Sequence, residues 1–105
     1  MKAIWKDKVV AEADKKDLIY IEGNWYFPPA SVKKDFLRKS DTPYTCPWKG
    51  GCQYFDIGQA DDWSKDNAWS YPKPKSSAIE IVKKSSGGKD FSNYVAFWRD
   101  VKVEE

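Results

Sequence analysis

Short runs that alternate apolar and polar residues, separated by turn-forming pairs, make up most of this chain. Two such pairs, Lys6-Asp7 and Gly23-Asn24, each lie between two β-rich runs. A two-residue connection between β-rich runs is a strong signal for a β-hairpin. The pattern therefore predicts two antiparallel hairpins near the N-terminus.

The remaining alternation predicts more strands. Strands are expected at residues 52–57, 69–71, 94–98 and 101–103. The acidic, polar segment 58–67 is expected to be a loop. Closely spaced hairpins favour an antiparallel sheet over a parallel one. We therefore predict an all-β fold, mainly antiparallel, with one or two short helices.

Helical spacing is confined to two segments. In residues 75–84, the apolar residues Ala78, Ile81 and Val82 fit one face of a helix, which makes this segment the best helix candidate. Residues 30–37 are predicted to form a helical turn or two, because the proline before them suits a helix N-terminus.

Aromatic residues are abundant in a chain that is otherwise polar. Six Trp, six Tyr and five Phe make up 16% of its 105 residues, whereas 32% are charged and the mean hydropathy is −0.76. This length is typical of one domain, so we expect a single domain over residues 1–105 with an aromatic core. The 18 basic and 16 acidic residues are well mixed and give a net charge of +2. Without a basic stripe, nucleic acid is not an expected partner.

The chain has two Cys and no His, which removes several kinds of chemistry. A structural zinc site needs four ligands, mostly Cys and His, so neither a metal nor another cofactor is expected. Catalysis by a histidine base is excluded as well. The sequence shows no leader-like or membrane-spanning apolar segment. We therefore expect a cytoplasmic protein without membrane contact, whose thiols stay reduced.

One short stretch concentrates reactive and aromatic side chains. Cys46, Trp48, Lys49 and Cys52 lie around a double glycine, which allows the backbone to turn through positive φ. If the two side chains face each other, Lys49 would lower the pKa of the Cys46 thiol. The simpler interpretation is a tight turn with a buried cysteine and a packed tryptophan.

Several motifs give a family resemblance. The chain resembles the family named domain of unknown function 427, most specifically in Tyr26-Phe27-Pro28-Pro29 and in Cys46-Pro47-Trp48-Lys49-Gly50. The matching stretches run in order along nearly the whole chain, at residues 2–5, 22–29, 31–32, 36–37, 40–42, 46–50, 68–74 and 94–98. Residues 83–93 look like an insertion relative to that family, and we expect them to form a solvent-exposed loop.

The resemblance implies a compact all-β fold of the Mss4-like, or β-tent, type. Relatives of that architecture include zinc-binding modules and methionine sulfoxide reductases of the B type, but this chain lacks paired Cys-x-x-Cys ligands. The family also carries a nucleotidyltransferase label. That reaction needs clustered carboxylates and a phosphate-binding loop. The one acidic pair on a predicted loop, Asp61-Asp62, lies outside the family motifs, so we do not expect nucleotidyl transfer.

Polar residues recur beside aromatic ones in three separate segments, which suggests a ligand pocket. Amphipathic aromatic rings suit pocket walls, and a few oriented polar groups provide specificity. We therefore predict a site for a small polar or aromatic ligand. Its predicted walls are Tyr26, Trp48, Trp69 and Tyr71, and its predicted polar contacts are Glu22, Asn24 and Lys49.

Three other interpretations stay open. Cys46 could be the catalytic nucleophile of a thiol-dependent enzyme, activated by Lys49. Glu22 or Asp56 would then transfer protons. An exposed Trp63 could instead make the domain a protein-interaction module. Finally, the aromatic residues could be core alone, with Glu22 and Lys49 forming a plain surface ion pair.

Overall fold

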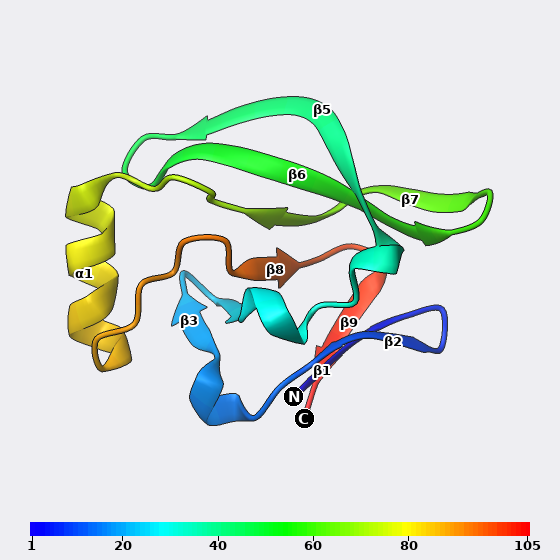
Figure 1. The fold of residues 1–105 in the computed structure, drawn as a ribbon, viewed down its shortest axis with the longest axis horizontal. Helices are drawn as coiled ribbons and strands as arrows, with labels where there is room; N and C mark the ends of the chain where they lie inside the picture. The colour runs from blue at the N-terminus through cyan, green and yellow to red at the C-terminus, as the bar shows by residue number, and fades with distance from the viewer.

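The computed structural model describes residues 1–105 as two antiparallel β-sheets and one α-helix (Figure 1). The strands are β1 (Lys2–Trp5), β2 (Lys8–Glu12), β3 (Ile19–Ile21), β4 (Asn24–Phe27), β5 (Leu37–Cys46), β6 (Gly50–Gln59), β7 (Asp62–Ser70), β8 (Val95–Phe97) and β9 (Val101–Glu104). The helix is α1 (Ser76–Ser86), and the short 3-10 turns are η1 (Lys15–Asp17), η2 (Pro29–Ser31) and η3 (Lys34–Phe36). This content confirms the predicted all-β class. None of the helices combines the length and the apolar sequence needed to cross a membrane.

The strands form a small and a large sheet. The three-stranded sheet has the order β2-β1-β9, and the six-stranded sheet has the order β3-β4-β8-β7-β6-β5. Strands β3 and β5 are therefore the edges of the large sheet. Lys2 lies opposite Glu104 in the small sheet, so the two ends of the chain lie side by side (Figure 1).

The two predicted hairpins form, with a one-residue shift in the second. Lys6 and Asp7 join β1 to β2 with φ angles of 46° and 65°, the positive values that a type I′ turn requires. Glu22 and Gly23, rather than Gly23 and Asn24, join β3 to β4. Asn24 therefore begins β4, and the alternation of side chains places it on the same face as Tyr26.

One prediction of loop structure is wrong, and a second holds only in part. Residues 58–67 form the end of β6, a tight turn and most of β7, with Gln59 opposite Asp62. Ala60 takes the positive φ of 56° in this turn, so no glycine marks the hairpin in the sequence. Residues 83–93 are not a wholly exposed loop either, because their first part completes α1 and Phe91 is fully buried.

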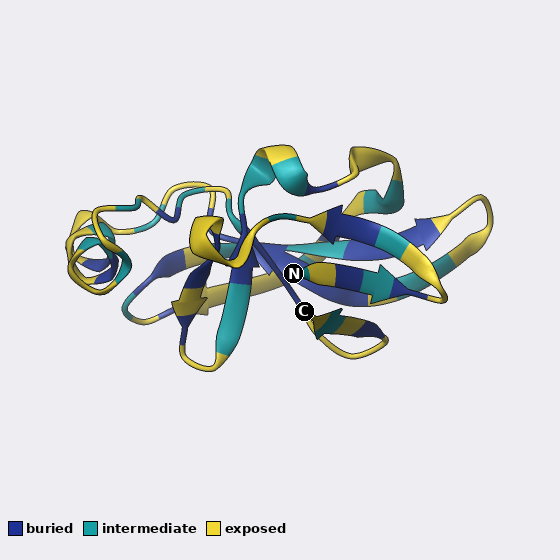
Figure 2. Cartoon of the chain, turned by 90° about the horizontal axis from the view of Figure 1, so that it is seen from below, coloured by how far each residue is buried: buried dark blue, intermediate teal, exposed yellow.

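The large sheet has two faces because side chains alternate along each strand. We call the face toward the small sheet the inner face. It contributes Phe27, Ile57 and Phe97 to a buried cluster that Trp5 and Val10 of the small sheet complete. The buried residues in Figure 2 follow the strands, whereas the turns are mostly exposed.

We call the opposite face of the large sheet the outer face. Its buried cluster joins Tyr26 and Trp69 of the sheet to Ala78 and Val82 of α1. Ala78 and Val82 belong to the apolar face that the helical spacing predicted, whereas Ile81 is exposed. The helix therefore covers one end of the outer face (Figure 1) and leaves the rest of that face to the side chains described next.

Candidate functional site

One cross-strand row of the outer face brings predicted site residues together. Tyr26, Ala96 and Trp69 lie directly opposite one another on β4, β8 and β7, and Tyr54 continues the row on β6. Ala96 contributes only a methyl group, so the rings on either side meet over it. The indole Nε1 of Trp69 donates a buried hydrogen bond of 3.0 Å to the hydroxyl of Tyr26. The two ring planes are at 90°, an edge-to-face arrangement that aromatic pairs favour.

A cavity of about 250 Å³ opens beside this row. Its lining residues are Asn24, Tyr26, Tyr44, Lys49, Tyr54, Trp69, Tyr71 and Trp98. Five of the seven residues predicted as ligand contacts line it, and the other two, Glu22 and Trp48, contact Lys49. The volume is slightly below the range of about 300–1,000 Å³ that is usual for ligand pockets, so only a small molecule would fit.

Lys49 brings a positive charge into this cavity. Its side chain is only 7% exposed, and its ammonium group forms an ion pair with the carboxylate of Glu22. The ammonium also lies 5.1 Å from the ring centroids of both Trp48 and Tyr71, within cation–π distance. Because the lysine is buried, the interpretation of a plain surface ion pair does not describe it. A buried charge needs such partners to offset its lost hydration.

The backbone has positive φ angles at or next to both residues of this ion pair. Glu22 has a φ of 50°, in the left-handed region that non-glycine residues rarely adopt. Its carboxylate also accepts a hydrogen bond of 3.4 Å from Trp48 Nε1. Gly50 has a φ of 109°, which explains the first glycine of the double-glycine motif. The carbonyl of Lys49 accepts a 2.9 Å bond from the backbone N–H of Lys75, which ties the turn to the start of α1.

Three lining residues, Tyr44, Tyr54 and Trp98, were not predicted as ligand contacts. The rings of Tyr54 and Trp98 are nearly parallel, with an interplanar angle of 11° and centroids 6.3 Å apart. Tyr44 lies 6.4 Å from Tyr54 across β5 and β6. Tyr54 lies two residues after Cys52 in β6, so both side chains point to the outer face. This spacing was the available sequence signal for Tyr54. Placing Tyr54 beside Trp69 required the pairing of β6 with β7, and the residues 58–67 that form their hairpin were predicted as a loop.

The ionisation of the site follows from burial and from the ion pair. Burial raises the pKa of Tyr26 and of Tyr71 well above the usual tyrosine value. The hydrogen bond from Lys49 lowers the pKa of Glu22 below its ordinary value. At neutral pH the cavity therefore presents neutral phenols beside an ion pair whose acid is ionised. Burial also raises the pKa of the Cys52 thiol to about 11, so this thiol is rarely ionised.

The residues predicted for thiol chemistry each have other contacts. Cys46 is 5% exposed, belongs to the outer-face cluster and does not line the cavity. Lys49 pairs with Glu22. Asp56 is engaged elsewhere, because its carboxylate accepts hydrogen bonds from Arg38 and from the backbone N–H of Asp66. The contacts of Cys46 are those of a small packed side chain.

Trp63 does not present an open apolar surface. Its ring is half-buried and faces the guanidinium of Arg38, whose carbon lies 4.4 Å from the ring centroid. Its indole N–H donates a 2.8 Å bond to the carbonyl of Ala60.

The structure also contains no group of three or more His, Cys, Asp or Glu side chains placed to hold a metal ion.

The fold and this cavity define a small all-β domain with an aromatic-lined pocket. A family model described as "Domain of unknown function (DUF427)" matches residues 1–105, and the chain belongs to this family. The match confirms the resemblance carried by the Tyr-Phe-Pro-Pro and Cys-Pro-Trp-Lys-Gly motifs. No curated protein matches the chain.

Proposed function

We propose that this domain binds a small planar molecule that carries a hydrogen-bond acceptor, with its ring among the aromatic side chains of the outer-face cavity. The observation that supports this best is the convergence of Asn24, Tyr26 and Lys49 on a cavity whose other lining residues are all aromatic. Apolar walls with a few oriented polar groups are typical of small-molecule sites.

The polar groups of the cavity favour an acceptor on the ligand. The ammonium of Lys49 has three protons and a single acidic partner, Glu22. The hydroxyl of Tyr26 accepts a bond from Trp69, which leaves its own proton free to be donated. No carboxylate lines the cavity. A carboxylate or carbonyl on the ligand would therefore be bound, and an amine would be repelled by Lys49.

A series of three ligands with the same ring tests this proposal. We expect benzoate and benzamide to bind and benzylamine not to bind, because only the first two offer an acceptor to Lys49. Titration followed by ¹H–¹⁵N NMR would show saturable shifts for the backbone amides of Tyr44 and Tyr54. The indole signals of Trp69 and Trp98 would shift with them. Equal binding of benzylamine, or no shift with any of the three, would contradict the proposal.

A matched pair of variants locates the binding. Tyr44 and Tyr20 are exposed tyrosines on β5 and β3, the two edge strands of the same sheet. Only Tyr44 lines the cavity. We expect Tyr44→Ala to weaken benzoate binding several-fold and Tyr20→Ala to leave it unchanged. Equal effects of the two substitutions would place the binding elsewhere.

Other features predicted from the sequence stay proposals. They are the Mss4-like type of the fold, a single domain, a cytoplasmic location, and action without a cofactor, nucleic acid or a membrane. The free thiols of Cys46 and Cys52 are compatible with a reducing location. A thiol-dependent reaction at Cys46 remains the alternative, and alkylation of Cys46 as a function of pH would test it.

A further inference from the structure

We propose a second binding site, on the inner face, for a small amphiphilic carboxylic acid with an apolar body. A cavity of about 510 Å³ lies there, where β5 to β8 meet the segments around η2 and η3. Its lining residues are Pro29, Lys34, Leu37, Lys39, Phe55, Ser70, Asn93 and Val95. This cavity shares no lining residue with the outer-face cavity.

The floor of the second cavity is apolar and fixed by strand register. Phe55 lies opposite Lys39 on β5, and Val95 lies opposite Ser70 on β7. Val95 belongs to the inner-face core, and Leu37 and Phe55 pack against that core. An apolar ligand body placed here would remove these side chains from water, which is favourable in proportion to the area covered.

Three polar side chains of the lining have no partner within the chain. The ammonium of Lys39, the amide of Asn93 and the hydroxyl of Ser70 make no hydrogen bond to another residue. Ser70 is only 3% exposed, but its hydroxyl is not among the side-chain atoms sealed from solvent without a partner, so it is open to the cavity. Of the three, only Ser70 is buried, whereas Lys39 and Asn93 are exposed and can bind water. Because buried polar groups are normally hydrogen-bonded, the Ser70 hydroxyl is the group best suited to a ligand, and Lys39 and Asn93 lie at the rim beside it.

The charge of the lining favours an acid. Two lysines and no carboxylate line the cavity. Lys34 donates a 3.0 Å bond to the carbonyl of Pro29, whereas Lys39 has no ion pair. A carboxylate could accept hydrogen bonds from Lys39, Ser70 and Asn93, and charge-assisted bonds of this kind are the strong ones.

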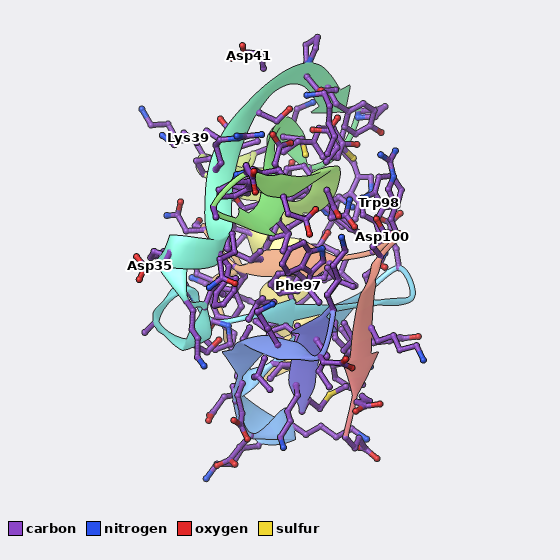
Figure 3. All side chains as sticks on the ribbon, turned by 90° about the vertical axis from the view of Figure 1, so that its right-hand side faces the viewer. Asp35, Lys39, Asp41, Phe97, Trp98 and Asp100 are labelled. Atoms are coloured by element: carbon purple, nitrogen blue, oxygen red, sulfur yellow. The ribbon has the colours of Figure 1, made fainter.

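The two cavities open on opposite sides of the large sheet. Figure 3 shows Lys39 at one side of the ribbon and Trp98, a residue of the outer-face cavity, at the other. Strand alternation explains this, because Ser70 and Phe55 alternate with Trp69 and Tyr54. The inference therefore does not depend on the proposed function, and either site could exist without the other.

Titration with octanoate, followed by ¹H–¹⁵N NMR of the full chain, tests the inference. We expect saturable shifts at Leu37, Phe55, Asn93 and Val95, and much weaker shifts with 1-octanol, which lacks the carboxylate. Lys39→Glu should weaken octanoate binding about tenfold, because a charged hydrogen-bond partner is replaced by a like charge.

Two further variants make the result decisive. Lys84→Glu makes the same charge change at an exposed position of α1, and it should leave octanoate binding unchanged. Ser70→Ala removes one hydroxyl and should weaken binding several-fold. The inference is overturned if octanoate shifts none of these amides, or if 1-octanol binds as tightly. It also fails if Lys39→Glu binds octanoate like the original chain, or if the shifts fall on the outer face.

Discussion

The two faces of the large sheet are built from the same strands, yet their centres have different chemistry. At the centre of the inner face, Phe27 and Phe97 are buried, their ring centroids are 5.5 Å apart, and neither side chain has a polar atom. At the centre of the outer face, Tyr26 and Trp69 are also buried, but they meet through a hydrogen bond between their polar atoms. Burial alone therefore does not distinguish a core from a candidate site in this protein.

The difference lies in what each side chain needs when it is buried. A phenylalanine is stabilised by apolar contact from any direction. Burial of apolar surface is therefore sufficient to hold the small sheet against the inner face. A buried tyrosine or tryptophan also needs a partner for its polar atom, which fixes the direction of the ring. On the outer face, the hydroxyl of Tyr26 and the ammonium of Lys49 remain as hydrogen-bond donors beside the cavity. The outer face thus combines part of the core with the features of a binding site.

The largest effect on stability is expected at the centre of the inner face. Phe27→Ala would remove a fully buried ring and leave a cavity against Phe97. We expect the free energy of unfolding to fall by about 3–5 kcal/mol, measured by urea denaturation. A loss below about 1 kcal/mol would show that this face is not the main source of stability and would break the comparison.

A smaller effect is expected when only a polar atom of the outer face is removed. Tyr26→Phe keeps the ring but leaves the buried N–H of Trp69 without its acceptor. We expect a loss of about 1–3 kcal/mol in the free energy of unfolding, since an unsatisfied buried donor keeps its full desolvation cost. Tyr94→Phe is the control, because Tyr94 is half-buried and its hydroxyl makes no hydrogen bond to another residue. Equal losses in both variants would mean that the Tyr26–Trp69 bond does not matter.

This contrast also explains how much could be predicted from the sequence. The turn pairs and the alternation were sufficient for the first hairpin and the all-β class, and grouped polar and aromatic residues indicated most of the outer-face lining. The β6–β7 hairpin was missed because Ala60, an unusual residue for a positive φ, forms its turn. Tyr44, Tyr54 and the whole inner-face cavity were missed because they depend on pairing between β5, β6 and β7. Such pairing joins residues far apart in the chain, and no local pattern specifies it.

The ion pair at the edge of the outer face should contribute less than the Tyr26–Trp69 bond. Glu22→Gln leaves the buried Lys49 without its counter-ion, but the Glu22 side chain is 56% exposed, so solvent screens the loss. We expect the free energy of unfolding at pH 7 to fall by about 1 kcal/mol. Glu80→Gln on the exposed side of α1, where the glutamate has no ion pair, should have no effect.

The same variant makes a prediction about pH. The hydrogen bond from Lys49 lowers the pKa of Glu22 from its ordinary value of 4.5, so the folded state binds this proton more weakly than the unfolded state. The contribution of the ion pair is therefore complete above pH 4.5 and is lost as the pH falls through the lowered pKa. Urea midpoints of the original chain and of Glu22→Gln should differ at pH 7 and converge in acid. A constant difference at all pH values would show that the ionised carboxylate is not what stabilises Lys49.

The smallest effect on stability is expected for the variant with a selective effect on binding. Tyr44 is 47% exposed on an edge strand, and its closest aromatic neighbour, Tyr54, is held separately by its stacking on Trp98. Tyr44→Ala should therefore change the free energy of unfolding by less than about 0.5 kcal/mol, as is usual for exposed positions. The same variant should weaken benzoate binding, whereas Phe27→Ala should lower stability far more than it lowers the affinity of the remaining folded protein. If Tyr44→Ala destabilised the chain as much as Tyr26→Phe does, the outer-face aromatic residues would form one continuous core, and their directed polar atoms would no longer be evidence for a site.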